Sequence, residues 1–135
     1  MEIVKSTTSA YSPDLGRVLT AGEITELEGL VRRVPVADEV IAFAVRLAGS
    51  TRPSEQASPQ FIRDWVSWGA GPRASQYLIL GAKTRAMLLG RYTPAIDDVR
   101  AVARPVLRHR IVTNFAAEAE NVKPDAIVER LVREL

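Results

Sequence analysis

Hydrophobic residues recur every three or four positions along much of this 135-residue chain, which is the spacing of one face of a helix. The pattern is clearest in residues 21–34, 38–47 and 124–135. Thr20 and Glu23 stand three residues apart at the start of the first segment, as in a capping box. No segment alternates convincingly between apolar and polar residues. The pattern therefore predicts an all-α domain, a compact bundle of about six helices.

The middle of the chain predicts two further helices with marked ends. Ser58 and Pro59 supply an N-cap and a proline at the first helical position of a short helix that ends before Gly69. This helix carries both tryptophans, which we expect to pack between helices. Pro72 opens the longest helix in the same way, and Gly90 ends it as a C′ glycine.

Another helix is predicted over residues 95–103, with Asp97 and Asp98 in its first turn, where the helix dipole favours acidic side chains. We expect Pro105 to break this helix and to begin a new turn, because proline lacks the N–H that a helix interior requires. Residues 112–115 are predicted to form a short extended piece.

The beginning of the chain differs in character from the rest. Residues 1–5 could finish a helix that began elsewhere, whereas residues 6–13 are rich in serine and threonine and favour turns. We therefore expect a connector at 1–20, a helical domain at 21–115 and a C-terminal helix at 116–135 that packs on it. An ordinary frayed N-terminus explains the first residues equally well.

Composition excludes several kinds of site. The chain has no cysteine and one histidine, so it holds no disulfide, no thiolate metal site and no multi-histidine cluster. It shows no signal-peptide pattern, and its longest apolar stretch, residues 40–45, is too short to cross a bilayer. The net charge of +2 is mild, but basic residues outnumber acidic ones between Lys83 and Arg110. Such a segment suits phosphates, an acidic partner or plain solvent.

No catalytic constellation is visible in the sequence. His109 lies between two arginines, without a serine or cysteine in a nucleophile pattern. Glu118 and Glu120 are expected in a solvated loop. The chain has neither a glycine-rich loop ending in Gly-Lys-Ser/Thr nor an apolar strand ending in Asp-Glu. It therefore lacks a P-loop and the acidic pair that holds Mg²⁺, and alone it should be inactive.

Arg73 is the residue that points to a ligand. It follows Gly69, Gly71 and Pro72 on the first turn of the longest predicted helix. A helix N-terminus carries unpaired N–H groups and a partial positive charge, so a cation there is disfavoured unless it meets an anion. Both carboxylate and phosphate qualify as that anion. The spacing alone leaves a phosphate contact and an ordinary surface arginine equally open.

A series of motifs runs through the chain in a fixed order. They are Leu30-Val-Arg-Arg-Val-Pro-Val36, Gly69-Ala-Gly-Pro-Arg-Ala-Ser75, Tyr77-Leu78, Ala82-Lys83, Ala86, Gly90-Arg91, Asp98-Val99 and Pro105-Val-Leu-Arg-His-Arg110. In order and spacing, this combination resembles the lid domain of MoxR-family AAA+ ATPases. The resemblance implies an AAA+ lid fold in which Arg73 is the sensor 2 arginine, reaching the γ-phosphate of ATP, with Gly71 and Pro72 beside it.

The same resemblance implies further contacts and partners. His109 and Arg110 match the family's His-Arg pair, for which we expect an interdomain or intersubunit contact. The Walker A, Walker B, sensor 1 and arginine-finger parts would lie upstream of Met1, so residues 1–20 would connect from a missing AAA+ core. The parent would be a cytoplasmic ring that uses ATP and Mg²⁺ to remodel or mature client proteins. Its partners would include its own core, neighbouring subunits and proteins with von Willebrand factor A domains.

Two matters stay open at this point. Arg73 could serve the ATP of its own subunit or that of a neighbour, and no cofactor is expected on the isolated chain. The alternative interpretation is a freestanding helical module that binds an acidic protein or nucleic acid through residues 83–110, with nucleic acid the less favoured partner and no membrane contact expected.

Overall fold

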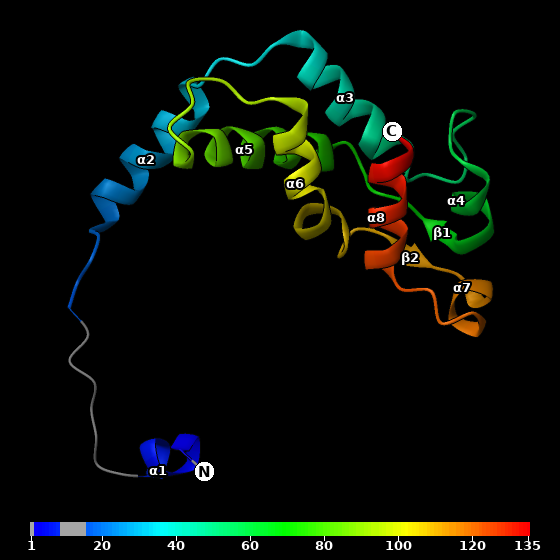
Figure 1. Cartoon of the computed structure of the whole chain (residues 1–135), viewed down its shortest axis with the longest axis horizontal. Helices are drawn as coiled ribbons and strands as arrows, with labels where there is room; N and C mark the ends of the chain where they lie inside the picture. Colours follow the sequence, from blue (N-terminus) through cyan, green and yellow to red (C-terminus); the bar gives the residue numbers. More distant parts are fainter. Residues whose placement is uncertain (1, 9–15) are drawn as a thin grey trace.

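A computed structural model describes residues 2–8 and 16–135 of the chain (Figure 1). The elements, in chain order, are α1 (Glu2–Thr8), α2 (Ala21–Arg33), α3 (Asp38–Gly49), α4 (Gln60–Trp65), β1 (Val66–Trp68), α5 (Arg73–Leu88), α6 (Ile96–Leu107), β2 (Val112–Thr113), α7 (Phe115–Ala119) and α8 (Pro124–Glu134). The predicted all-α class is confirmed. The described residues form eight helices rather than about six, together with one sheet of two short strands.

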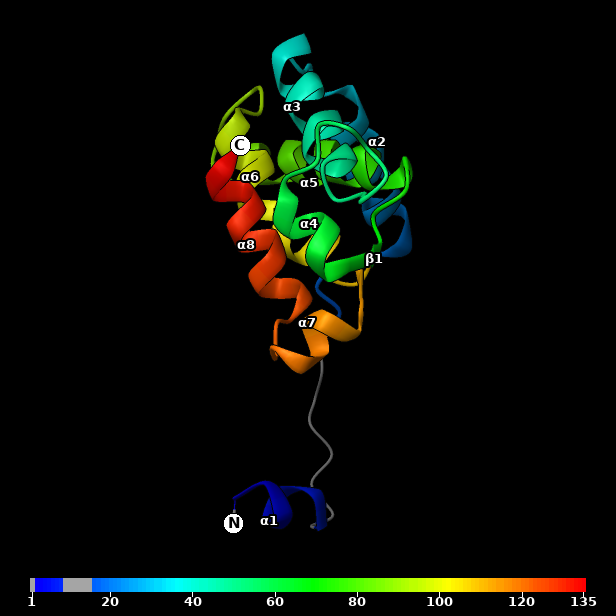
Figure 2. The ribbon, with the colours of Figure 1, turned by 90° about the vertical axis from the view of Figure 1, so that its right-hand side faces the viewer.

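Helix α5 lies at the centre of the domain, where it contacts α2, α3 and α6, and α8 in turn packs against α6 (Figure 2). The residues that α5 buries are mostly small and stand four apart: Ala74, Leu78, Ala82 and Ala86. Residues at this spacing share one helix face, and small side chains there let neighbouring backbones approach closely. The core therefore forms around a helix whose buried side carries little bulk of its own.

The start of α2 confirms the predicted capping box. The Glu23 N–H donates to Thr20 Oγ1 at 3.2 Å, and the Thr20 N–H donates to a Glu23 carboxylate oxygen at 2.7 Å. The apolar side of the helix is also present, but α2 buries none of its residues, and Ile24, Leu27 and Leu30 are 40–48% exposed. Sequence periodicity identified the helix correctly but says nothing about whether its apolar side is covered within this chain.

The prediction that Pro105 breaks its helix is wrong, because Pro105 lies within α6. Pro105 lacks the N–H that would donate to the Ala101 carbonyl, but the helix continues past this single missing bond, and the Arg108 N–H donates to the Arg104 carbonyl at 3.1 Å. The left-handed backbone expected at Gly90 is confirmed by its φ of 71°.

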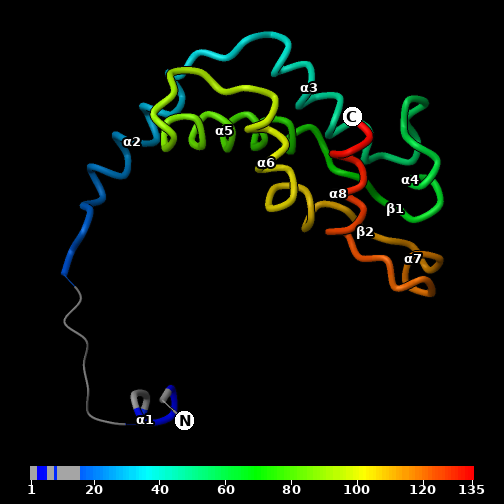
Figure 3. The backbone as a smooth tube through the Cα atoms, viewed as in Figure 1, coloured from blue at the N-terminus to red at the C-terminus, as the bar shows by residue number. Residues whose placement is uncertain are grey.

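The prediction for the two tryptophans holds for Trp65, which packs against the core beside Arg130 of α8, and is wrong for Trp68. Helix α4 ends at Trp65, and the next three residues pair with β2 as an antiparallel strand (Figure 3). Trp68 stands on this strand and is 73% exposed, so it does not pack between helices. The extended piece expected near residues 112–115 is present as β2, but its partner strand was not foreseen.

Two smaller predictions need correction. Glu118 lies in α7 rather than in a loop, and the carboxylate of Glu120 accepts a hydrogen bond from Trp65 Nε1 at 3.2 Å instead of being only solvated. At the other end, α1 includes residues 6–8, which were expected to favour turns. The rest of that predicted turn segment, residues 9–13, lies outside the described residues. The division at 20 and 115 stays a prediction.

Candidate functional site

Arg73 lies on the first turn of α5, as the sequence predicted, but it is the first residue of the helix, and Pro72, predicted at that position, is the N-cap. Its side chain is exposed and makes no hydrogen bond or ion pair with any residue of ranges 2–8 and 16–135. Pro72 before it already has helical backbone angles, φ −56° and ψ −30°, and Ala74 after it is fully buried. The helix therefore begins on a fixed backbone and presents a free guanidinium to solvent at its positive end.

The segment before Arg73 is held by the loop that connects α3 with α4. The Ala70 N–H donates to Thr51 Oγ1 at 2.8 Å, and Arg52 Nε donates to the Ala70 carbonyl at 2.9 Å. Gly69 lies against the same loop, where a Cβ would stand 2.3 Å from the carbonyl oxygen of Thr51. Glycine is thus required at position 69 by the close approach of two backbones.

Gly71 has a different environment from Gly69. A Cβ built on Gly71 would meet nothing within 4 Å. The residue is exposed, as are Pro72 and Arg73, so this end of α5 is accessible to a ligand. Of the three residues predicted to lie at a phosphate, Arg73 alone brings a charge, and Gly71 leaves open space where a side chain would stand.

The predicted His109–Arg110 pair follows α6 at the surface. One guanidinium nitrogen of Arg110 donates to the Val106 carbonyl oxygen and also contacts His109 Nε2. The same guanidinium lies over the ring of Tyr77, 5.0 Å from its centroid. Tyr77 stands one turn after Arg73 on α5, so it links the two predicted site elements on one side of the domain. Sequence reasoning missed this link, because no local signal pairs residues 33 positions apart.

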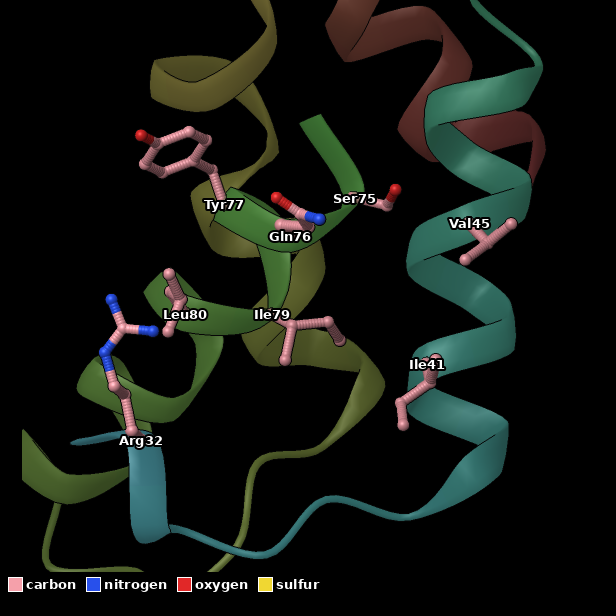
Figure 4. A pocket seen from close by; sticks show the side chains of 8 residues that line it. All are labelled: Arg32, Ile41, Val45, Ser75, Gln76, Tyr77, Ile79 and Leu80. Carbon is pink, nitrogen blue, oxygen red and sulfur yellow. The ribbon is translucent and has the colours of Figure 1, made fainter. Parts of the chain in front are cut away.

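An apolar groove lies next to these residues. It encloses about 620 Å³ and is lined by Arg32 of α2, Ile41 and Val45 of α3, and Ser75, Gln76, Tyr77, Ile79 and Leu80 of α5. Figure 4 shows the eight side chains on the segments of α2, α3 and α5 that surround the groove, with the ring of Tyr77 directed away from α3. Ile41, Val45 and Tyr77 are 40–54% exposed, so the groove is open to solvent in this chain.

The basic side chains of residues 83–110 are held by partners within the fold. Every basic side chain from Lys83 to Arg110 has a partner among the described residues: Arg85 and Arg91 with Asp98, Arg100 with Asp97, Arg104 with Asp125 and Glu129, Arg108 with Asp125, Lys83 with the Arg32 carbonyl and Arg110 with the Val106 carbonyl. The hydrogen bond from Arg104 also lowers the pKa of Asp125. A broad anion-binding surface over residues 83–110 is therefore not favoured.

The described residues offer neither a metal site nor a membrane span. No group of three or more histidine, cysteine, aspartate or glutamate side chains in them is placed to hold a metal ion. None of the helices formed by these residues has the length and apolar character needed to cross a membrane.

Comparison with known proteins identifies the family. The profile of the AAA lid domain matches residues 62–131, just over half of the chain. The chain belongs to the AAA lid domain family. The match includes Arg73, His109 and Arg110, and it extends through most of α8.

The curated relatives of this lid domain are MoxR proteins. Over 121 residues it is 31% identical to Chaperone MoxR1 of Mycobacterium tuberculosis, which covers 90% of this chain and 32% of the relative. Over 67 residues it is 39% identical to Protein MoxR of Paracoccus denitrificans, covering 50% of this chain and 19% of the relative. The lid domain thus spans about a third of the length of the first of these relatives.

One solved structure has the same fold. A crystal structure of a candidate ATPase from Cytophaga hutchinsonii superimposes with a TM-score of 0.84, at 22% identity, over 98% of this chain and 40% of the other. At that identity the likeness establishes the fold of the lid domain. The chain is therefore an AAA lid domain that is similar in sequence to MoxR proteins and shares its fold with this ATPase structure.

Proposed function

We propose that this lid domain carries the sensor 2 arginine of a MoxR-like AAA+ ATPase, and that Arg73 contacts the γ-phosphate of ATP held by the ATPase core. The observation that carries the proposal is an exposed guanidinium on the first turn of α5, with no partner in the described chain. A cation at the positive end of a helix is unfavourable unless an anion joins it.

The residues around Arg73 fit a phosphate. The fork of N–H donors on a guanidinium matches the geometry of phosphate oxygens, and such charge-assisted hydrogen bonds are worth about 1.5–3 kcal/mol each. The space at Gly71, two residues before Arg73, is open, so a phosphate can approach this backbone without displacing a side chain there. Bound ATP with Mg²⁺ would supply the negative charge that the helix start and Arg73 both favour.

Coupling to work on a client follows from the rigid attachment of Arg73. Ala74 is buried and Ala70 is hydrogen-bonded on both sides, so a force on the arginine is transmitted to the body of the lid. When the γ-phosphate is lost, the contact is lost with it, and the lid can rotate against the core. We propose that a cytoplasmic ring of such subunits uses this rotation to remodel or mature client proteins.

His109 and Arg110 complete the proposed contact surface. Both follow α6, and Arg110 stacks on Tyr77 one turn beyond Arg73. We propose that they contact the core or the neighbouring subunit, beside the nucleotide rather than on it. We also propose partners with von Willebrand factor A domains, and this part of the proposal is supported only by the resemblance to the MoxR family.

The test is the rate of ATP hydrolysis by the full-length protein that carries this domain. Arg73→Ala should lower the rate by about 10³-fold or more, because arginines that act on phosphoryl transfer contribute factors of that size. Arg133→Ala is the matched control, since Arg133 is an exposed arginine on α8. An unchanged rate in Arg73→Ala would show that the sensor 2 assignment is wrong.

A further inference from the structure

The buried polar side chains of the domain are unevenly distributed. Four polar or charged residues are buried in the described chain. Ser50, Thr51 and Ser58 belong to the loop between α3 and α4, and Asp98 lies in α6. Burying a hydroxyl is unfavourable unless it is hydrogen-bonded, so such groups are retained where their bonds fix a geometry. The hydrogen bonds of the buried Thr51 and Ser58 hydroxyls therefore hold the loop in one conformation.

The hydrogen bonds of this loop converge on the segment before Arg73. Thr51 Oγ1 donates to the Ala48 carbonyl at 2.7 Å and accepts from the Ala70 N–H at 2.8 Å, so it joins the end of α3 to that segment. Arg52 Nε holds the Ala70 carbonyl at 2.9 Å, while Ser58 Oγ donates to the Arg52 carbonyl at 2.6 Å. Both backbone polar groups of Ala70 are thus bound by neighbouring residues of one loop.

We propose that Thr51 and Arg52 are positioning residues for Arg73: they fix Ala70 so that α5 begins in the orientation that directs the guanidinium to its phosphate. The inference rests on the proposed sensor 2 function of Arg73. Neither residue is proposed to touch the nucleotide. Thr51 is fully buried, and Arg52 uses its donors on Ala70 and on Glu55.

The connection from Ala70 to Arg73 is short and stiff. Pro72 restricts its own φ, the Ala74 N–H donates to the Gly71 carbonyl at 2.9 Å, and Ser75 Oγ donates to the Pro72 carbonyl at 2.7 Å. Gly71 is the single residue of this connection without a side chain. A shift of Ala70 therefore moves the first turn of α5 and displaces the arginine, and a misplacement of about 1 Å can cost up to about 10²-fold in rate.

The test is a double-mutant cycle in the full-length protein, with ATP hydrolysis measured under single-turnover conditions so that slow variants remain measurable. Arg52→Met removes the donor to Ala70 but keeps most of the side chain, and it is combined with Arg73→Ala. Glu55→Gln is the matched control, because it weakens the 2.9 Å ion pair of Arg52 with Glu55 but leaves the bond to Ala70 in place.

A second pair of variants addresses Thr51 itself. Thr51→Val removes the hydroxyl with little change in shape, whereas Thr51→Ser keeps it. If Thr51→Val fails to fold, the Arg52→Met cycle alone tests the positioning role. Arg52 is only half-buried, so its substitution disturbs the core less than a substitution of Thr51.

The expected result is that Arg52→Met and Thr51→Val each slow hydrolysis about tenfold in the parent protein, within the range for a misplaced group, and cause no further slowing once Arg73 is alanine. Thr51→Ser and Glu55→Gln should hydrolyse at the parent rate. If Arg52→Met and Thr51→Val slow hydrolysis in the Arg73→Ala protein as much as they do in the parent protein, the positioning role is overturned and the sensor proposal stays intact. An unchanged rate in Arg73→Ala alone would instead overturn the sensor proposal.

Discussion

Arg91 holds the buried carboxylate of Asp98 through two parallel hydrogen bonds. Its Nη1 and Nη2 donate to Oδ2 and Oδ1 at 2.8 Å and 2.6 Å, and the Ala95 N–H donates to Oδ2 at 2.8 Å. The Asp98 side chain is 3% exposed, whereas that of Arg91 is 41% exposed. Asp98 thereby caps α6 from within its first turn, where Ala95 has no side-chain oxygen to do so.

Asp98→Asn should destabilise the domain by about 1–3 kcal/mol, because the charged acceptor of a buried hydrogen-bond network is replaced by a neutral amide. Asp97→Asn is the matched control. Asp97 is the preceding residue on the same turn, and its side chain is 87% exposed, so its loss should change stability little. Urea unfolding of both variants followed by circular dichroism measures the difference. Equal stability of the two variants would contradict the role given to Asp98.

The stability that Asp98 contributes should depend on pH in a defined direction. The hydrogen bond from Arg91 is the main cause that lowers the pKa of Asp98 below its ordinary value of 3.8. A lowered pKa in the folded state means that the contribution is present above the unfolded-state pKa and is lost as the pH falls through the folded-state value. Parent and Asp98→Asn proteins should therefore differ in stability near neutral pH and converge in acid. A stability gap that stays constant, or that widens, as the pH falls below 3.8 to the lowest measurable value would count against this account.

Gly69 and Gly71 should respond in opposite ways to alanine. A Cβ at Gly69 would lie 2.3 Å from a backbone oxygen of Thr51, which cannot move aside as a side-chain end would. We expect Gly69→Ala to cost about 1–3 kcal/mol of stability, as overpacked sites do. Gly71→Ala, with open space around it, should be neutral or stabilising by up to about 1 kcal/mol. Thermal unfolding of both variants checks the contrast, and similar losses would refute it.

Local sequence signals predicted those parts of the fold that depend on neighbouring residues. The capping box at Thr20, the left-handed Gly90 and the place of Arg73 on the first turn of α5 all follow from interactions within a few residues. Pro105 was predicted wrongly because proline weakens a helix interior by one missing hydrogen bond without always ending the helix, and α6 continues past it to Leu107. The residues next to Pro105 did not indicate that the helix would continue beyond it.

Features that depend on distant residues were not predicted. The strand at Trp68 forms because Val112 is its partner, and the bonds of Ala70 come from Thr51, nineteen positions away. The stacking of Arg110 on Tyr77 likewise joins two elements that the sequence treats separately. The sequence therefore pointed to Arg73 as a candidate but not to the residues that hold it in place.

The isolated domain should bind nucleic acid very weakly, because the basic side chains from Lys83 to Arg110 already have partners in the fold. Non-specific binding usually has a dissociation constant of about 10⁻⁴–10⁻⁶ M at physiological salt, and we expect the domain to fall at or beyond the weak end of that range. Fluorescence anisotropy of a labelled DNA duplex at two salt concentrations measures this. Asp125→Asn, which releases Arg104 from its 2.7 Å ion pair, should bind more tightly and with a steeper salt dependence than the parent. Tight, steeply salt-dependent binding by the parent domain would revive the freestanding binding module as its function.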